Sequence, residues 1–523
     1  MNFVKIPSIY PKLLELRKSK TADFKPNKYL KKSTKLRYYQ VVGALHMMLL
    51  NRMVLGDFTG LGKTVETLAA YSWMLTEDPT LKLLVICNKS AMYQWGEEID
   101  KFMEGVTYKV IENEYEGMTG IKARSAQYKP FHENVMIINY APVRQEYEMI
   151  KEGLGNYMMV MDEVTVVKNR KSAIHMACSE VGRDAKRVYG LSATIIKNGL
   201  EEVYGIYDVV VPGLFGRITH FKKQFCVERK MRLRIRGKIR HIPKVVGYKN
   251  LKEFRNLIDP YFLGRKKEEV ADELPKLISR KITLEMLDEQ REAYREALNG
   301  IFHEEKVKGQ FFELADKVRN GARDEKTLTA YDAYKKKYEQ FLTEEDKKRG
   351  KLAAITYCQM ISDGPGLLEL KGDSSKFEEF KRLISEELIT EKVIIYTRFK
   401  KAIPFLEIIC ERNHWSYTKI TGDENSKERD QARIKFSSDE KCNIIFITSA
   451  GSESLNLQAA SAIIFFDTPW SYGDLAQTIG RAQRIGSIRD HVLLIHLVNK
   501  GTIDMRIMNR VSKKKNLSDE IIG

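Results

Sequence analysis

Short apolar runs alternate with helical patterns in two separate blocks of the 523-residue chain, and this alternation limits the fold more than any other feature. In the first block we expect strands at residues 53–55, 83–87, 135–138, 158–161 and 188–191. In the second block we expect strands at residues 393–396, 444–447, 463–466 and 492–497. Strands that alternate with helices form parallel sheets covered by helices. The sequence therefore predicts an α/β fold with two parallel-sheet lobes in tandem.

The segments outside the two blocks have a different composition. From about residue 288 to residue 350 the chain is rich in Glu, Lys, Ala and Gln, which predicts long, exposed helices. The lysine-dense stretch 17–37 is either a basic arm or a solvated lead-in segment. The expected division of the chain is a basic N-terminal arm (1–35), a first lobe (36–275), a helical insertion and linker (276–370), a second lobe (371–505) and a basic C-terminal tail (506–523).

A basic hairpin is expected inside the first lobe, at about residues 226–248. Apolar residues alternate there with basic residues around Gly237, and the basic residues include Arg232, Arg234 and Arg236. One face of such a hairpin would be cationic and would fit a phosphate backbone. The alternative interpretation is a solvated strand edge that charge protects from aggregation.

Charge and composition favour a nucleic-acid partner. The formal net charge of +18 attracts polyanions, since each phosphate contact releases counterions. Apolar runs are too short to cross a bilayer, and the N-terminus does not resemble a signal peptide, so we expect no membrane role.

The six cysteines form no CxxC pair and the nine histidines show no ligand spacing, so we expect buried, reduced thiols and no structural zinc.

A phosphate-binding loop is predicted at residues 56–64, GDFTGLGKT, between the first strand and a helical pattern. Gly60 and Gly62 would let backbone amides approach phosphates, and Lys63 would supply a point charge. Thr64 would hold Mg²⁺ at the N-terminus of the helix. ATP with Mg²⁺ is therefore the expected cofactor.

Two later segments predict the rest of the nucleotide site. Asp162 and Glu163 follow an apolar strand, where such carboxylates handle Mg²⁺ and the hydrolytic water, with Asp162 on the metal and Glu163 as the base. Arg481 and Arg484 are three residues apart and would share one face of a helix. Both could reach a γ-phosphate that the first block holds, as arginine fingers supplied by the same chain.

With these residues in view, the chain resembles a superfamily 2 helicase or translocase of the Swi/Snf type, from about residue 36 to residue 516. The segments that carry this resemblance are LRYYQ (36–40), LLVICNKSAMYQWGEEIDKF (83–102), DEVTVVKNRKS (162–172), LSATIIKNGLEEVYGIYDVVVPGLFG (191–216), YFLGRKKEEVADELPK (261–276), TGDENSKERDQARIKF (421–436) and TSAGSESLNLQAAS (448–461). The resemblance implies a DNA-dependent ATPase with two RecA-like lobes.

The same resemblance implies further site residues. Arg37, Gln40 and Gln477 would join the nucleotide site, with Gln40 reading the adenine base. Five residues would contact DNA in addition to the hairpin arginines: Lys89, Lys168, Asn169, Thr448 and Asn456.

These expectations imply an ATP-driven translocase that moves along duplex or branched DNA with little sequence preference, in replication, recombination or repair. Branch migration or remodelling of protein–DNA complexes would follow from that movement. One alternative is a strand-separating DNA or RNA helicase, with the hairpin near Gly237 as its wedge. Another is a nucleic-acid-binding scaffold with a degenerate motor, against which the complete set of catalytic residues argues. No segment resembles a chromodomain, a bromodomain or a zinc module, so we expect a bacterial or viral setting and no nucleosome partner. We also expect a monomer that is cytoplasmic and associated with DNA.

Overall fold

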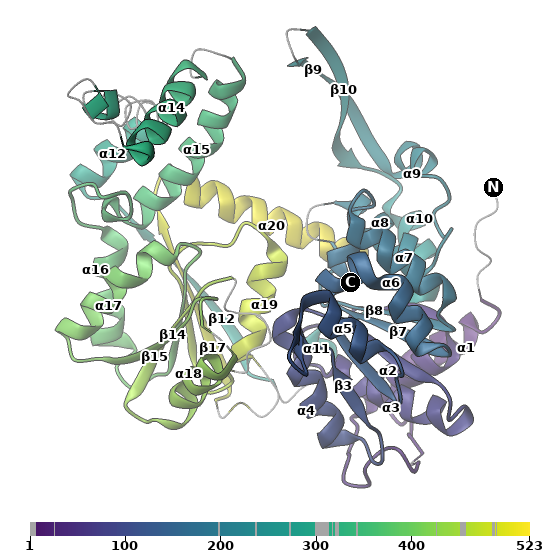
Figure 1. Ribbon diagram of the computed structural model, residues 1–523. Coiled ribbons are helices and arrows are strands. Elements are labelled where there is room, and N and C mark those ends of the chain that lie inside the picture. Colours follow the sequence, from purple (N-terminus) through teal and green to yellow (C-terminus); the bar gives the residue numbers. More distant parts are fainter. Residues whose placement is uncertain are drawn as a thin grey trace.

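Two parallel sheets, each in its own lobe, organise the computed structural model of the chain (Figure 1). The structure describes residues 7–25, 27–196, 199–235, 238–270, 274–298, 313–315, 317–318, 324–340, 344–424, 426–449, 457–483, 487 and 489–522. The predicted fold class, two parallel-sheet lobes with helices, is confirmed.

The sheet of the first lobe has seven strands in the order β11-β1-β8-β7-β2-β6-β3, and every neighbouring pair is parallel. Its strands are β1 (Arg52–Leu55), β2 (Lys82–Cys87), β3 (Tyr108–Val110), β6 (Val135–Asn139), β7 (Tyr157–Asp162), β8 (Arg187–Leu191) and β11 (Phe262–Leu263). The five expected strands are β1, β2, β6, β7 and β8. The sequence did not predict β3 and β11, because two- and three-residue edge strands are too short to show a period.

Helices cover both faces of this sheet. Leu83 and Val85 of β2 pack on one side with α1 (Tyr10–Lys18), α2 (Tyr38–Leu49), α3 (Lys63–Glu77) and α4 (Met92–Phe102). Leu84 and Ile86 pack on the other side with α5 (Gly120–Tyr128), α6 (Tyr140–Leu154), α7 (Ala173–Asp184), α8 (Leu200–Val210), α9 (Ile218–Phe225) and α10 (Leu251–Ile258). Because successive side chains of a strand point to opposite faces, a strand buried on both faces is apolar throughout.

The sheet of the second lobe has six parallel strands in the order β12-β17-β16-β13-β15-β14. These strands are β12 (Lys276–Leu284), β13 (Val393–Tyr396), β14 (Ser416–Ile420), β15 (Cys442–Ile447), β16 (Ala462–Phe465) and β17 (His491–Asn499). Helices α16 (Ser375–Arg382) and α17 (Ile403–Arg412) cover one face, and α18 (Ser426–Ser438) and α19 (Tyr472–Ala482) cover the other.

Strand β12 corrects the expectation that the helical insertion and linker begin at residue 276. Residues 276–284 instead form the edge strand of the second sheet and pair with β17 along their whole length. Most of their side chains are exposed, so backbone pairing holds the strand in place, and an apolar period does not mark it. The insertion itself contains α12 (Asp288–Leu298), α14 (Glu325–Gln340) and α15 (Glu344–Asp363).

The N-terminal segment, where it is described, is docked on the first lobe and is not a free basic arm. Leu13 of α1 is fully buried. The Arg17 guanidinium pairs with the Asp259 carboxylate at 3.0 Å and donates to the Asp259 and Phe262 carbonyls, each at 2.7 Å. This basic residue therefore neutralises a charge inside the protein, and it does not extend towards a partner.

The C-terminal segment, expected as a basic tail, is helical where the structure describes it. Helix α20 (Ile503–Ile522) runs through it without interruption. Ile507 and Val511 of this helix are buried. In Figure 1 the helix extends from the second lobe to the first, and it contacts α10 there.

Strands β9 (Cys226–Ile235) and β10 (Lys238–Tyr248) form an antiparallel pair in the segment for which a hairpin was expected. Figure 1 shows this pair extending away from the body of the first lobe.

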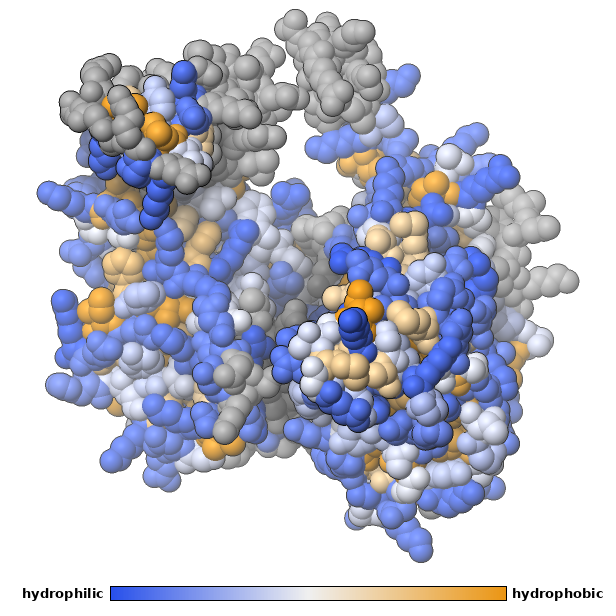
Figure 2. Space-filling view, in the orientation of Figure 1, coloured by the Kyte–Doolittle hydropathy of each residue, from blue (hydrophilic) through white to orange (hydrophobic). Residues whose placement is uncertain are grey.

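The expected burial of the cysteines is confirmed, since all six are buried, and none of them forms a disulfide. Among the described residues, no helix is long and apolar enough to cross a membrane. Figure 2 shows a mostly hydrophilic surface with small, scattered apolar areas on both lobes. Among the residues that the structure describes, no group of three or more His, Cys, Asp or Glu side chains forms a metal-binding cluster.

Candidate active site

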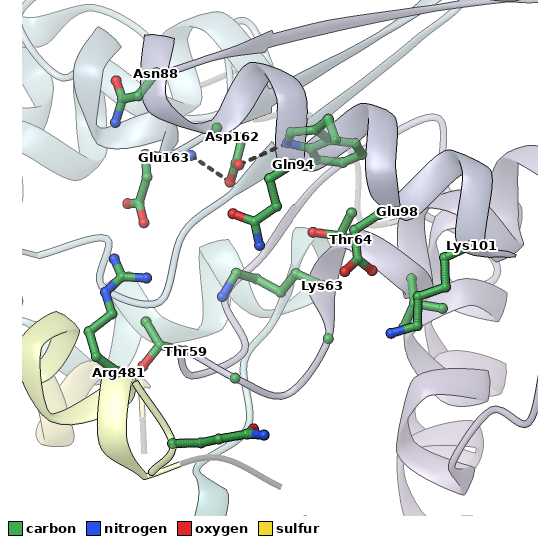
Figure 3. A pocket seen from close by; sticks show the side chains of 16 residues that line it. Thr59, Lys63, Thr64, Asn88, Gln94, Glu98, Lys101, Asp162, Glu163 and Arg481 are labelled. Carbon is green, nitrogen blue, oxygen red and sulfur yellow. Dashed lines mark hydrogen bonds between the residues drawn. The ribbon is translucent and has the colours of Figure 1, made fainter. Parts of the chain in front are cut away.

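The loop between β1 and α3 forms one wall of a cavity of about 380 Å³ (Figure 3). Gly60 and Gly62 have φ values of 87° and 97°, which glycine adopts without strain. A Cβ atom at Gly62 would lie 2.5 Å from Gln40 Nε2, so this position also has no space for a side chain. Lys63 and Thr64 begin α3 and line the cavity, at the end of a helix that favours anions. A glycine-containing loop that leads into the N-terminus of a helix has a geometry that can hold phosphate.

Asp162 lies at the end of β7 and also lines the cavity. Trp95 Nε1 donates to its Oδ2 at 3.0 Å, and the backbone N–H of Glu163 donates to its Oδ1 at 3.1 Å. Burial, and then the nearby charge of Glu163, raise the pKa of the Asp162 carboxyl above its usual value. The two donors fix the orientation of this carboxylate and leave lone pairs on both oxygens for a cation.

Glu163, which follows Asp162, has φ 55° and ψ 55°, a left-handed conformation that is uncommon for a residue with a side chain. Its carboxylate accepts a hydrogen bond from Ser192 Oγ at 3.3 Å. Ser192 comes directly after β8, and β8 neighbours β7 in the sheet. The carboxyl ends of adjacent parallel strands meet at one edge. That rule could have identified Ser192, which the sequence analysis did not include among the site residues.

The second lobe contributes Arg481 and Gln458 to the lining of the same cavity. The Arg481 side chain is largely buried and, in Figure 3, lies on the same side of the cavity as Glu163. The preceding residue, Gly480, lies against the phosphate-binding loop, because a Cβ atom there would be 1.9 Å from Thr59 Oγ1. The two lobes therefore meet at this cavity.

Five lining residues lie directly after β2 or in α4 and were not predicted for the nucleotide site: Asn88, Gln94, Trp95, Glu98 and Lys101. Gln94, Glu98 and Lys101 are separated by four and three residues, so they lie on one face of α4. This spacing is visible in the sequence and could have indicated a helix face directed at a ligand.

The other three predicted nucleotide residues do not line the cavity. Gln40 Nε2 donates to the Leu61 carbonyl at 2.9 Å, and Gln40 Oε1 accepts from the backbone N–H of Arg37 at 2.9 Å. Gln40 thus holds the phosphate-binding loop, and its reading of adenine stays a prediction. Gln477 is half-buried in α19, one turn before Arg481.

The predicted DNA contacts occupy different environments. Lys89 is exposed in a short 3-10 helix (Lys89–Ala91) that follows β2, whereas Lys168 pairs with Glu202 at 2.8 Å. Asn169 Oδ1 accepts from the backbone N–H of Lys171 at 3.1 Å, which stabilises a turn. Thr448 is buried, and its hydroxyl donates to the Thr421 carbonyl at 2.7 Å. Of these four residues, Lys89 and Asn169 are exposed and therefore accessible to a partner.

Several predicted residues lie outside the part of the chain that the structure describes. Arg484, Asn456 and Arg236 belong to this group. For Arg232 and Arg234 only the backbone of β9 is described. Their roles stay predictions.

Comparison with known families finds two domains in the chain. The SNF2-related domain matches residues 39–345, and the helicase conserved C-terminal domain matches residues 375–486. The first match alone covers more than half of the chain, and the two matches together include every described residue that lines the cavity.

Individual relatives are distant in sequence. The DNA excision repair protein ERCC-6 of Mus musculus is 23% identical over 499 residues, which cover 90% of this chain and 31% of that protein. The DNA repair and recombination protein RAD54B of Homo sapiens is 23% identical over 483 residues, covering 90% of this chain and 52% of its own length. This chain thus spans 31% of the length of the first relative and 52% of the length of the second.

Among solved structures, the Sulfolobus solfataricus SWI2/SNF2 ATPase core in complex with dsDNA matches with a TM-score of 0.42 and 24% identity. The match covers 95% of this chain and 94% of that one.

Proposed function

The chain belongs to the SNF2-related family, and we propose on this basis that it is a DNA-stimulated ATPase that moves along duplex or branched DNA. One observation carries the proposal. A single cavity is lined by Lys63, Thr64, Asp162 and Glu163 from the first lobe and by Arg481 from the second. These are the residue types that phosphoryl transfer to water requires, and they come from two separate lobes.

Each side chain has a role that follows from its position. Lys63 and the start of α3 would bind the phosphates of ATP. Glu163, oriented by Ser192, would accept the proton of the attacking water. Arg481 would stabilise the charge that develops on the γ-phosphate. Because Arg481 belongs to the second lobe, hydrolysis would depend on closure of the two lobes.

The residues present also fit Mg²⁺. This cation prefers oxygen ligands and is usually held by one or two protein groups together with substrate phosphates. The Thr64 hydroxyl and the Asp162 carboxylate both line the cavity, and Trp95 orients the carboxylate. When bound there, Mg²⁺ would neutralise charge on the β- and γ-phosphates of ATP.

Movement along DNA would follow from repeated closure and opening of the lobes. The net charge of +18 supports a polyanionic partner, and phosphate contacts carry no base information, so we expect weak sequence preference. Two relatives carry DNA repair in their names. This supports the proposal that the chain acts on DNA in repair or recombination, with branch migration or remodelling of protein–DNA complexes as the result.

Steady-state ATP hydrolysis tests the proposal. We would measure it without nucleic acid and with duplex DNA, branched DNA, single-stranded DNA or RNA, each beside Lys63→Ala. Strong stimulation by duplex or branched DNA that Lys63→Ala abolishes is the expected result. Stimulation only by single strands or by RNA would instead indicate a strand-separating helicase. Absence of turnover with every nucleic acid would contradict an ATPase and leave a binding scaffold.

A further inference from the structure

A buried ion cluster lies beside the phosphate-binding loop, outside the lining of the cavity. Arg265 Nε donates to Asp57 Oδ1 at 3.0 Å and to Asp57 Oδ2 at 3.1 Å, and Arg265 Nη2 pairs with Glu66 Oε2 at 3.0 Å. Asp57 belongs to the loop and Glu66 to α3, and both carboxylate side chains are fully buried. Two buried carboxylates require a cation beside them, so Arg265 is necessary for this packing.

The same guanidinium reaches a third segment. Arg265 Nη1 donates to the Tyr39 carbonyl, and the guanidinium lies 5.5 Å from the centre of the Tyr39 ring. Arg265 therefore joins the loop, α3 and α2 through one planar group. A lysine carries the charge but has no planar fork, so it cannot reproduce the pairing of two guanidinium nitrogens with the Asp57 carboxylate.

Two hydrogen bonds to backbone carbonyls connect this cluster to the phosphate-binding residues. The N–H of Phe58 donates to the Arg265 carbonyl at 3.2 Å, next to Asp57. The Asp57 carbonyl in turn accepts from Lys63 Nζ at 2.7 Å. The position of the lysine that would bind phosphate thus depends on the loop segment that Arg265 holds.

Arg265 also begins the connection between the lobes. Leu274, further along this connection, packs against Tyr39 and Leu61. The next residue, Pro275, accepts a hydrogen bond through its carbonyl from Gln483 Nε2 at 2.8 Å. Gln483 lies two residues after Arg481. The connection is therefore attached to the phosphate-binding loop at one end and beside the arginine of the second lobe at the other.

We propose that Arg265 is a positioning residue for the ATPase reaction: it fixes the phosphate-binding loop through Asp57 and Glu66 and ties that loop to the connection between the lobes. The proposal rests on the proposed function, since it assigns a role in binding ATP. Arg265 does not touch the cavity, so it acts through the loop and is not a catalytic residue.

Two variants test this role without leaving buried charges unpaired. Arg265→Lys keeps the positive charge and removes the fork. The triple variant Asp57→Asn, Glu66→Gln, Arg265→Met removes all the charges together. The matched control is Arg52→Met at the start of β1, because Arg52 donates to the carbonyls of Gly182 at 2.6 Å and Val210 at 3.3 Å and lies outside the nucleotide cavity.

The readouts are the equilibrium Kd for MgATP and for MgADP, the KM and kcat of hydrolysis, and the thermal unfolding temperature without nucleotide. We expect both Arg265 variants to raise Kd and KM by about tenfold or more, with a smaller fall in kcat. Arg52→Met should lower the unfolding temperature and leave Kd unchanged. Wild-type Kd in both folded Arg265 variants would overturn the positioning role.

The outcome separates this inference from the proposed function. If the unmodified chain binds and hydrolyses ATP while the Arg265 variants match Arg52→Met, the positioning role alone is wrong. If the unmodified chain binds no nucleotide, the proposed function fails first.

Discussion

Gly480 of the second lobe lies so close to Thr59 of the phosphate-binding loop that a Cβ atom at position 480 would be 1.9 Å from Thr59 Oγ1. This close approach joins a helix of one lobe directly to the nucleotide loop of the other. The residue after Gly480 is Arg481, which lines the cavity. The approach of the arginine to ATP therefore depends on the absence of a side chain at position 480.

Replacing Gly480 with alanine should separate nucleotide binding from hydrolysis. Because the added methyl group keeps the lobes apart, we expect kcat to fall about tenfold or more, while the Kd for MgATP, set mainly by the first lobe, changes by about twofold or less. Gly247→Ala is the control, since the nearest atom to a Cβ there lies at 3.9 Å. An unchanged kcat in Gly480→Ala would show that closure does not bring these residues together.

Replacing Trp95 with phenylalanine removes the donor to Asp162 Oδ2 and keeps the aromatic packing. The carboxylate would then be less well oriented, and we expect the Mg²⁺ concentration for half-maximal hydrolysis to rise about tenfold, as is typical when a hydrogen-bond partner of a metal ligand is removed. A titration of Mg²⁺ at saturating ATP measures this. Trp415→Phe in the second lobe controls for the loss of an indole, and an equal rise in both variants would contradict a role at Asp162.

His46 predicts a pH dependence of stability. The ring is fully buried, its Nδ1 lies 2.8 Å from the Val42 carbonyl, and its Nε2 accepts from Arg17 Nε at 3.3 Å. Burial lowers the pKa of His46 to about 3, whereas a histidine of the unfolded chain titrates near the ordinary pKa of 6.5. Between these two pH values only the unfolded chain binds the proton, so the free energy of unfolding decreases as the pH falls.

Denaturant unfolding between about pH 7.5 and about pH 4.5, a range chosen to span the upper part of this window, measures the effect. His46→Gln should lose part of the decrease that the unmodified chain shows. His220→Gln, at an exposed histidine of α9, is the control and should keep the decrease. If His46→Gln shows the same slope with pH as the unmodified chain, the buried neutral histidine is not its source.

The hairpin arginines should contribute to DNA affinity through phosphates. For Arg232→Ala, Arg234→Ala and Arg236→Ala combined, we expect a weaker Kd for duplex DNA and a salt dependence whose slope falls by about one for each phosphate that the arginines no longer bind. Basal ATP hydrolysis without DNA should be unchanged. The triple change Lys12→Ala, Lys18→Ala, Lys20→Ala at the N-terminus removes the same charge and serves as the control. An equal weakening in both triple variants would contradict a specific role for the hairpin.

A companion experiment removes residues 231–240. If the chain separates strands, unwinding should be lost and basal ATP hydrolysis retained, because the hairpin is then the wedge. Unwinding that survives the deletion would remove the hairpin from that role.

The local parts of the site could be predicted from the sequence. The glycines before Lys63, the acidic pair after a run of apolar residues, and the two blocks of strands all depend on residue type and on spacing within a short segment. Backbone conformation and the two-residue period of a strand are short-range properties. The sequence therefore predicted the loop, the strand end and the two parallel sheets correctly as elements.

The residues that contact those elements from distant parts of the chain could not be predicted, and these contacts decide the geometry of the site. Trp95 is 67 residues from Asp162, and Arg265 is 208 residues from Asp57. Gln40 holds the loop, Arg17 neutralises Asp259, and residues 276–284 join the second sheet as a strand. Contacts at such separations depend on how helices and sheets pack in three dimensions. No local period encodes that packing, so only the tertiary structure identifies which buried charges and donors meet.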